Sequence, residues 1–352
     1  MPIRTDDLRI KSLRPLISPA ILMEEVAVGE SGLETVARAR GAVADVLTGI
    51  SPRLLVVVGP CSIHDPEAGL EYARRLKPVA DELADDLLIV MRAYFEKPRT
   101  TVGWKGLIND PFFDNSCKIN QGLRKARGFL RDVVELGMPT ATEFLDPITP
   151  QFIADLVSWG AIGARTVESQ VHRELASGLS MPVGFKNGTG GSVQIAVDAI
   201  SAAAHPHHFL SVTKQGITAI VETMGNRHCH VILRGGGGKP NYAAEDVAKV
   251  TRILVENELP ARLMIDCSHA NSGKDPTRQP LIARDVAERI ARGEQEIFGL
   301  MLESFLVGGR QEVRKSEPMT FGQSITDACI GWDDTVPVLR DLARAARLRR
   351  SG

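Results

Sequence analysis

The stretch Leu-Leu-Val-Val-Val-Gly-Pro-Cys-Ser-Ile-His-Asp-Pro, residues 54 to 66, begins as an apolar run and ends with a cysteine, a histidine and an aspartate. An apolar run of this length, closed by glycine and proline, is typical of a strand buried on both faces of a parallel sheet. Taken alone, Cys61 is a small core residue, and His64-Asp65-Pro66 is a turn followed by a helix start. Whether the end of this strand also carries chemistry depends on what stands at the ends of the other strands.

Similar apolar runs recur along the whole chain and are separated by longer stretches with helical spacing. This alternation predicts repeated strand–helix units and a parallel sheet. Eight such units in 352 residues favour a (β/α)8 TIM barrel over an open, doubly wound sheet. The expected strands are residues 54–58, 87–91, 140–143, 161–165, 182–186, 230–234, 263–266 and 297–303.

Two segments lie outside this minimal pattern. Residues 1–45 precede the catalytic barrel of residues 46–352, and we interpret them as an arm that plugs the barrel or packs against another subunit. Residues 209–213 and 218–222, on either side of Gly216, predict a β-hairpin inserted between the fifth and sixth barrel strands.

Two helices are expected from their end signals. Ser31 and Glu34 have the spacing of a capping box and predict a helix through Val46. Thr149-Pro150 predicts the start of a helix over residues 151–159, with Gly160 as its stop signal.

Composition excludes several classes of protein. With 43% hydrophobic and 24% charged residues the chain is globular rather than disordered, and a net charge of -1 gives no electrostatic reason for a nucleic-acid partner. No apolar run approaches the length of a membrane span. Five cysteines, an odd number, fit a reducing cytoplasm better than a disulfide framework.

An ionisable or metal-binding side chain stands at or just after the end of every expected strand. In a (β/α)8 barrel these ends converge on one mouth, so the eight side chains are predicted to share one cavity. A single arginine at a strand end is usually just a solvated side chain. Ionisable or metal-binding side chains at all eight strand ends indicate a common function. The residues are Cys61, Arg92, Glu143, Arg165, Lys186, Arg234, His269 and Glu303.

The basic members of this set predict an anionic ligand. Guanidinium groups match carboxylate and phosphate oxygens in pairs, which favours sugar phosphates or phosphorylated acids. The loop over residues 97–106 adds Lys97, Arg99, hydroxyl groups and glycines, and suggests a second anion pocket. The glycines of residues 235–238 would let backbone approach a phosphate, or would form only a loose loop.

Cys61, His269, Glu303 and Asp327 offer a mixed thiolate, imidazole and carboxylate set for one divalent metal ion, namely Mn, Fe, Co or Zn. Spacing alone does not prove this set, and His269 alone could be either a ligand or a structural residue. An open coordination position would admit a substrate oxygen.

Seven motifs, spread from near the first strand to the last loop, resemble those of the class I 3-deoxy-D-arabino-heptulosonate 7-phosphate (DAHP) synthases. The resemblance extends from Asp6 to about Trp332. The motifs are Gly59-Pro60-Cys61-Ser62, Lys97-Pro98-Arg99-Thr100, Gly163-Ala164-Arg165-Thr166, Gly184-Phe185-Lys186-Asn187-Gly188-Thr189, Leu233-Arg234-Gly235-Gly236, Asp266-Cys267-Ser268-His269-Ala270-Asn271 and Ser324-Ile325-Thr326-Asp327-Ala328-Cys329.

The resemblance implies condensation of phosphoenolpyruvate with erythrose 4-phosphate, the entry step of the shikimate pathway. It implies that Cys61, His269, Glu303 and Asp327 bind the metal. It places the phosphoenolpyruvate phosphate near Arg165, Lys186 and Arg234, and its carboxylate near Arg92 and Lys186. Lys97 would contact both substrates, Arg99 and Thr100 would bind erythrose 4-phosphate, and Glu143 and Lys97 are the candidates for proton transfer. The run of four glycines before Lys239 is longer than relatives commonly carry, which would loosen the loop.

The resemblance is to the feedback-regulated branch of the family, which implies inhibition by an aromatic amino acid in a homodimer or homotetramer. Ser211 favours phenylalanine over tyrosine because it takes the space of a phenol hydroxyl, whereas Pro147 resembles tyrosine-sensitive relatives. Cys329 lies two residues beyond Asp327, and oxidation could link it to Cys61, unless it is an inert buried thiol. The implied effector residues are Asp6 and Asp7 of a neighbouring arm, Phe144, Pro147, Gln151, Leu175, Leu179, Ser180, Phe209, Ser211 and Val221.

Three other functions deserve comparison. The sister enzyme that makes 3-deoxy-manno-octulosonate 8-phosphate from a five-carbon sugar phosphate fits less well, because the Lys-Pro-Arg-Thr loop and the arm are both present. A Schiff-base aldolase would need a desolvated nucleophilic lysine. An inactive amino-acid sensor would need neither the metal ligands nor the anion-binding groups.

Overall fold

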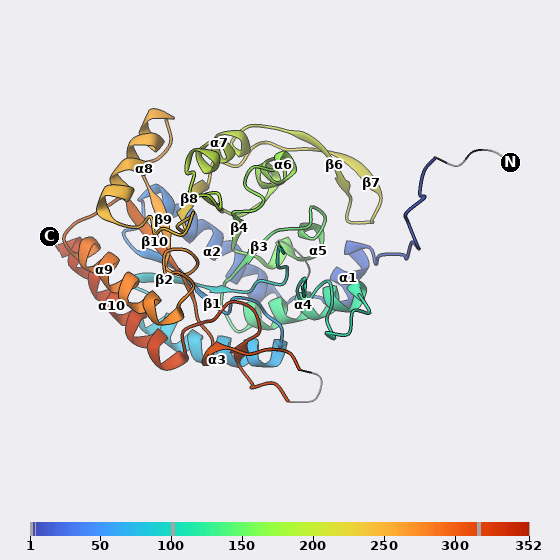
Figure 1. Ribbon diagram of the computed structural model, residues 1–352, viewed down its shortest axis with the longest axis horizontal. Helices are drawn as coiled ribbons and strands as arrows, with labels where there is room; N and C mark the ends of the chain where they lie inside the picture. Colours follow the sequence, from blue (N-terminus) through green and yellow to red (C-terminus); the bar gives the residue numbers. More distant parts are fainter. Residues whose placement is uncertain (1–2, 4, 100–102, 315–317, 352) are drawn as a thin grey trace.

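The computed structural model describes residues 3, 5–99, 103–314 and 318–351, and a closed barrel of parallel strands forms its centre (Figure 1). Around the barrel each strand pairs with the next one along the chain, and the last pairs back onto the first. The predicted (β/α)8 barrel is therefore confirmed. Its strands are β1 (Leu54–Gly59), β2 (Leu87–Arg92), β3 (Thr140–Glu143), β4 (Trp159–Ile162), β5 (Val183–Lys186), β8 (Cys229–Leu233), β9 (Leu263–Asp266) and β10 (Ile297–Glu303).

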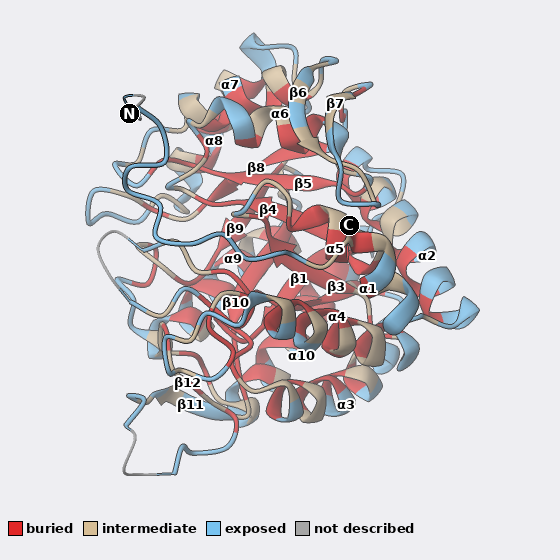
Figure 2. Cartoon of the chain, turned by 90° about the vertical axis from the view of Figure 1, so that its right-hand side faces the viewer, coloured by how far each residue is buried: buried red, intermediate tan, exposed pale blue. Residues whose placement is uncertain are grey.

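Helices surround the barrel and bury one face each against its strands, so burial follows the barrel wall while the outer helix faces remain exposed (Figure 2). The stretch quoted above shows how one of them begins. Asp65 caps the first helix after β1 by accepting hydrogen bonds from the amides of Glu67 and Ala68, and Pro66 occupies the first turn. The helices of the wall are α3 (Pro66–Glu82), α4 (Ile119–Glu135), α5 (Pro150–Ile153), α6 (Gln170–Gly178), α7 (Gln194–Ala203), α8 (Ala244–Glu256), α9 (Gln279–Ala291) and α10 (Trp332–Ser351).

Helix α2 (Glu30–Thr48) packs Val43, Val46 and Leu47 against side chains inside the barrel. It crosses the expected arm boundary at residue 45. The expected capping box at Ser31 is wrong, because the helix already begins at Glu30 with Gly29 as its N-cap. The amide of Gly29 donates to the carboxylate of Glu135 on α4, 2.9 Å away, so a tertiary contact replaces the local cap.

The expected helix over residues 151–159 is also wrong in its second half. Helix α5 ends at Ile153, a 3-10 turn follows over Ala154–Leu156, and Trp159 and Gly160 already belong to β4. Gly160 is not a helix stop but makes room for the Phe144 ring, since a Cβ there would lie 3.1 Å from it. The strand is held by its own contacts, including the indole of Trp159, which donates to Nε2 of His230 over 3.0 Å.

The predicted hairpin is confirmed as β6 (His208–Val212) and β7 (Thr218–Glu222), an antiparallel pair inserted between β5 and β8. It projects from the barrel wall toward the N-terminal side of the molecule (Figure 1). Helix α1 (Pro19–Glu25) joins this region, because the amide of Ala20 donates to the carbonyl of Lys214 in the hairpin loop, 2.7 Å away. The described residues before α1 are largely exposed and extend away from the barrel (Figure 1).

A small parallel sheet, β11 (Val307–Arg310) with β12 (Gln323–Ser324), precedes α10. Among the described helices, none has the length and apolar composition that crossing a membrane requires.

Candidate active site

A cavity of about 490 Å³ opens at the C-terminal ends of the barrel strands, and we call it the mouth cavity. Cys61 and Glu303 are not part of its lining and are buried, while Thr100 lies outside the described residues. Lys274 and Thr189 also line the cavity and were not expected from the sequence. The expected residues that line it are Arg92, Lys97, Arg99, Glu143, Arg165, Lys186, Arg234, His269 and Asp327.

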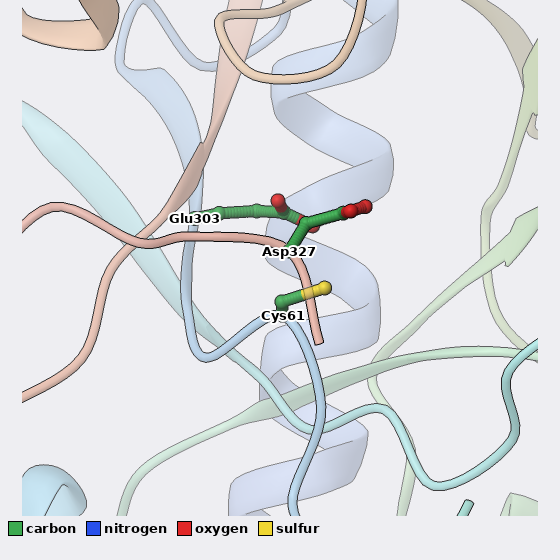
Figure 3. A group of neighbouring side chains, drawn as sticks. All are labelled: Cys61, Glu303 and Asp327. Carbon is green, nitrogen blue, oxygen red and sulfur yellow. The ribbon is translucent and has the colours of Figure 1, made fainter. Parts of the chain in front are cut away.

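Three of the four expected metal ligands form one compact group. The thiol of Cys61 and the carboxylates of Glu303 and Asp327 lie within 4.8 Å of one another. They come from the loop after β1, the end of β10 and the loop before α10, and their ends face one another (Figure 3). The chain therefore brings together two hard donors and one soft donor from distant positions.

His269 stands beside this group, with Nε2 4.0 Å from a carboxylate oxygen of Glu303. Its other ring nitrogen, Nδ1, lies 2.8 Å from Asp266 and 2.7 Å from the Ser268 hydroxyl. A histidine that donates Nδ1–H to a carboxylate presents the lone pair of Nε2 to a metal. Asp266, which was not among the residues expected from the sequence, thus orients the ring of the candidate ligand His269.

Burial would raise the pKa of Asp266, but the neighbouring His269 and Lys186, with hydrogen bonds from His269 and Ser268, hold it well below its usual value. The Lys186 ammonium lies 3.0 Å from the Asp266 carboxylate, and both side chains are buried. One carboxylate therefore orients both a candidate ligand and a candidate substrate cation.

The donors fit a divalent metal ion. Thiolate, imidazole and carboxylate together suit Mn, Fe, Co or Zn. Burial, with the negative charge of Glu303 adding to it, raises the pKa of the Cys61 thiol, so metal binding has to displace its proton. Lys97 opposes this, because its ammonium lies 3.2 Å from the sulfur and 3.1 Å from the Cys61 carbonyl. Cys329 is also a free, buried thiol.

Arg92 is almost fully buried and makes most of its contacts with the protein. It donates to Glu303 over 2.8 Å, to the Pro60 carbonyl over 3.0 Å and, through Nη2, to the Cys61 carbonyl over 3.3 Å. Its guanidinium also stacks 3.6 Å above the centre of the Tyr94 ring. Arg92 thus fixes the backbone and carboxylate of two candidate ligands as well as facing the mouth cavity.

The glycine run after Arg234 is not a loose loop. Gly236 and Lys239 exchange backbone hydrogen bonds of 2.9 and 3.0 Å around Gly237 and Gly238, whose φ angles are 57° and 77°. Positive φ at both central positions is the pattern of a type I′ turn. The amides of Gly235, Gly236 and Gly237 all donate to protein oxygens. At the base of the turn Gly236 touches backbone, since a Cβ there would lie 2.3 Å from Gly191.

A second cavity, of about 340 Å³, lies between the hairpin, α5, α6 and α2, and we call it the side cavity. Phe144 does not line it and is fully buried, and neither Asp6 nor Asp7 of this chain lines it. Three charged residues that were not expected, Arg40, Asp155 and Lys214, stand in its wall. The expected residues that line it are Pro147, Gln151, Leu175, Leu179, Ser180, Phe209, Ser211 and Val221.

The two cavities share one segment of the chain, because Glu143 faces the mouth cavity while Pro147 and Gln151 face the side cavity. Glu96 fastens this segment to the strand-end loop of Lys97. Its carboxylate accepts hydrogen bonds from the amide of Asp146 over 3.3 Å and the hydroxyl of Thr149 over 3.2 Å. Burial, with the charge of Asp146 adding to it, raises the pKa of Glu96 to about 8.

This pKa predicts a pH-dependent stability that Glu96→Gln should remove. A folded-state pKa of about 8, above the ordinary 4.5, means that Glu96 stabilises the fold below pH 4.5 and that this contribution is lost as the pH rises to 8. Between pH 6 and pH 9 the free energy of unfolding of the wild type should therefore fall by on the order of 2 kcal/mol more than that of Glu96→Gln. Denaturant unfolding of both proteins at the two pH values measures this difference. Glu67→Gln, at an exposed position, is the control and should follow the wild type at both pH values. If the free energies of unfolding of Glu96→Gln and the wild type differ by the same amount at pH 6 and at pH 9, the prediction is contradicted.

Comparison with known proteins was made on the whole chain. The family model described as the DAHP synthetase I family matches residues 26–340. The Phe-sensitive phospho-2-dehydro-3-deoxyheptonate aldolase of Escherichia coli (strain K12) is 59% identical over 350 residues, which cover 99% of this chain and 100% of that protein. The tyrosine-inhibited enzyme of Schizosaccharomyces pombe is 52% identical, covering 98% and 94%. The solved structure of the phospho-2-dehydro-3-deoxyheptonate aldolase of Francisella tularensis SCHU S4 has a TM-score of 0.95 at 52% identity, over 97% and 99% of the two chains.

Proposed function

This chain belongs to the DAHP synthetase I family, and from that membership we infer that it condenses phosphoenolpyruvate with D-erythrose 4-phosphate and water. The products are 3-deoxy-D-arabino-heptulosonate 7-phosphate and inorganic phosphate, so the enzyme is a transferase at the first step of aromatic amino acid biosynthesis. The observation that carries this function is the convergence of a cation-lined cavity and a Cys-Glu-Asp group on one barrel mouth. Phosphorylated acids and sugar phosphates are the ligands that such a mouth recognises.

Three cations would hold the phosphate of phosphoenolpyruvate, namely Arg165, Lys186 and Arg234. Lys186 and Arg92 would hold its carboxylate, and Lys97 would reach both substrates. Arg99 is the candidate for the phosphate of erythrose 4-phosphate. All six line the same cavity, so two anionic substrates can be held side by side despite their mutual repulsion.

Enzymes of this family generally depend on a metal ion, and we propose one divalent ion, Mn, Fe, Co or Zn, held by Cys61, His269, Glu303 and Asp327. When bound, it would supply Lewis-acid polarisation of the aldehyde.

The reaction itself forms one carbon–carbon bond and breaks one carbon–oxygen bond. C3 of phosphoenolpyruvate bonds to the aldehyde carbon, water adds to C2, and phosphate leaves from C2. Lys97 and Glu143, which both line the mouth cavity, are the groups proposed to deliver and accept the protons of these steps. Gly163 leaves the space that the Glu143 carboxylate occupies, since a Cβ there would lie 2.4 Å from it.

The contact between Lys186 and Asp266 argues against a Schiff-base aldolase, because the nitrogen that would attack a carbonyl is held 3.0 Å from a buried carboxylate oxygen. All five cysteines are free thiols, which suits the reducing cytoplasm proposed for this enzyme.

The decisive experiment mixes the purified protein with both substrates and Mn, and follows phosphate release and the mass of the product. A seven-carbon sugar phosphate should form. D-Arabinose 5-phosphate in place of erythrose 4-phosphate should give little turnover, and borohydride with either substrate should leave the protein mass unchanged. No condensation with erythrose 4-phosphate would overturn the proposed function.

The side cavity is proposed to bind an aromatic amino acid that inhibits the enzyme, with phenylalanine favoured over tyrosine. Apolar groups such as Leu175 and Val221 would pack on the ring, and Lys214 and Asp155 stand near enough to meet the charged ends of an amino acid. The arm of a second subunit, carrying Asp6 and Asp7, would complete the site in a homodimer or homotetramer. The exposed side chains of Leu210 and Ile220, paired across the hairpin, would be covered in such an assembly.

Ser211 decides which ring fits in this proposal, because its side chain takes the space that a phenol hydroxyl would need. Ser211→Gly should therefore shift the ratio of the inhibition constants for phenylalanine and tyrosine toward tyrosine by roughly tenfold. Inhibition curves for phenylalanine, tyrosine and tryptophan, each scaled to the uninhibited rate of the same variant, measure this ratio. An unchanged ratio would remove Ser211 from the role, and no inhibition of the wild type at millimolar concentration would remove the effector site altogether.

A further inference from the structure

Three asparagine side chains join the loops that follow β5, β8 and β9, and we propose that they are positioning residues for the cations that bind phosphoenolpyruvate. The three strands are neighbours in the barrel: β5 ends in Lys186, and the loops after β8 and β9 carry Arg234 and His269. This inference deepens the proposed function and rests on it, because it assigns a role toward the same substrate. The asparagines are Asn187, Asn241 and Asn271.

Asn187 follows Lys186 directly, is fully buried and uses both ends of its amide. The oxygen accepts hydrogen bonds from the backbone amide of Arg234 over 2.9 Å and from the side chain of Asn241 over 3.2 Å. The nitrogen donates to the carbonyls of Gly188 and Gly235, both at 3.0 Å. The Asn187 side chain thus binds the backbone N–H of Arg234 and the backbone C=O of Gly235. It ties the residue after Lys186 to the loop that carries Arg234.

Asn241 and Asn271 extend the same network to the third loop. The side-chain oxygen of Asn241 accepts from the amide of Gly235 over 2.7 Å, and its backbone amide donates to the Asn271 side chain over 2.8 Å. The side-chain nitrogen of Asn271 donates to the carbonyls of Leu233 and Asp266, at 3.0 and 2.8 Å. The backbone next to Arg234 is therefore held from both neighbouring loops.

The side chain of Arg234 contrasts with its tightly held backbone. Its Nε is buried and has no hydrogen-bond partner within the described ranges, while the residue lines the mouth cavity. A buried donor without a partner costs free energy unless a ligand satisfies it. The asparagines thus hold the backbone of an arginine whose side chain makes one long hydrogen bond among the described residues, 3.5 Å from Nη1 to the Gly235 carbonyl. This leaves donors for a ligand in the cavity.

An asparagine suits this place for two reasons. Its amide donates and accepts at once, so it can bridge a backbone N–H and a backbone C=O, which neither a carboxylate nor an aliphatic side chain does. It is also neutral, whereas an aspartate here would place a negative charge beside cations that must attract an anion. A network that only stabilised the fold would have no need to converge on the loops of two substrate cations.

The test compares two alanine variants with a matched control. Asn187→Ala removes four hydrogen bonds at a fully buried position, and Asn241→Ala removes two at a half-buried position, so the second variant keeps the test open if the first does not fold. Asn226→Ala is the control: Asn226 is buried, donates to three backbone carbonyls, and lies outside the mouth cavity.

We expect the KM for phosphoenolpyruvate to rise by about tenfold or more in both test variants, with kcat less affected, since small displacements of a positioned cation are costly. The KM for erythrose 4-phosphate should stay within about twofold, because Arg99 belongs to the loop after β2. Inorganic phosphate, competing with phosphoenolpyruvate, should bind more weakly in the same proportion. The control should lose thermal stability while both KM values stay at their wild-type level.

Two results would overturn the inference. One is an unchanged KM for phosphoenolpyruvate in folded Asn241→Ala and Asn187→Ala. The other is an equal rise of both KM values, or a rise that the control shares, which would assign the network to stability alone. Failure of the proposed function would look different from both results, because the wild-type protein itself would then not join phosphoenolpyruvate to erythrose 4-phosphate.

Discussion

Replacing Cys61 by alanine is expected to abolish metal binding and turnover together, even when Mn is supplied in excess. Cys61 is the soft donor of the compact group with Glu303 and Asp327, and no other thiol belongs to that group among the described residues. Loss of a partner that merely orients a ligand already costs 10- to 100-fold in affinity or activity, so loss of a ligand should lower kcat/KM by more than about 100-fold. Chelator should abolish the activity of the wild type, and added Mn should restore it.

Elemental analysis of protein purified without chelator measures the metal content of both forms. Cys229→Ala is the matched control, because Cys229 is also a buried free thiol. It stands at the N-terminal end of β8, outside the group of proposed metal ligands. It should keep both metal and activity. Normal metal content or normal turnover in Cys61→Ala would remove this residue from the metal site.

The second large effect is expected for Arg92→Met, which should damage stability and catalysis at once. Removing one member of a buried ion pair leaves the other charge without compensation, and the pair with Glu303 is almost fully buried. The free energy of unfolding should fall by about 3–5 kcal/mol. Catalysis should fall by more than about 100-fold, because Glu303 and the Cys61 carbonyl lose the group that holds them.

Arg127→Met separates these two effects. Arg127 is also buried and pairs with the partly exposed Asp155 at 2.7 and 2.9 Å, and neither residue belongs to the mouth cavity lining. It should lose comparable stability while kcat per folded molecule is preserved. Arg92→Lys should keep the charge but not the planar fork, and should remain strongly impaired. A wild-type kcat/KM in Arg92→Lys would show that the fork has no role.

The barrel was predictable because most of its strands are short apolar runs and most wall helices have a helical apolar period. The two predictions of helix ends were wrong because contacts with remote residues replace the local signals there. Gly160 looks like a helix stop in sequence, yet it accommodates the Phe144 ring inside a strand. Ser31 has the spacing of a cap, yet the N-cap lies two residues earlier, at Gly29, whose amide donates to Glu135. Such long-range partners leave no periodic trace in the sequence.

The site was predictable to the extent that charged side chains stand at strand ends. Its supporting residues were not, because an asparagine after a strand is normally a turn residue, and nothing in the neighbouring sequence indicates that Asn187 bonds to a second loop. Asp266 and Glu96 were missed for a similar reason, since Lys186, which pairs with Asp266, and Thr149, which donates to Glu96, are remote from them in sequence. Arg40 and Lys214 look like solvated charges on a helix and a hairpin loop, and only the fold places them in one cavity wall.

The contact between Gly236 and Gly191 has a consequence for how this enzyme can diverge. At the base of the glycine turn the two loops meet backbone to backbone, and any side chain on Gly236 would force them apart. At the tip, a Cβ on Gly238 would meet nothing within 4 Å. Natural variation in the length of this loop should therefore accumulate as insertions and deletions at the tip, while the base keeps its residue. A change in the number of glycines at the tip would therefore leave the base of the turn, and with it the backbone next to Arg234, in place.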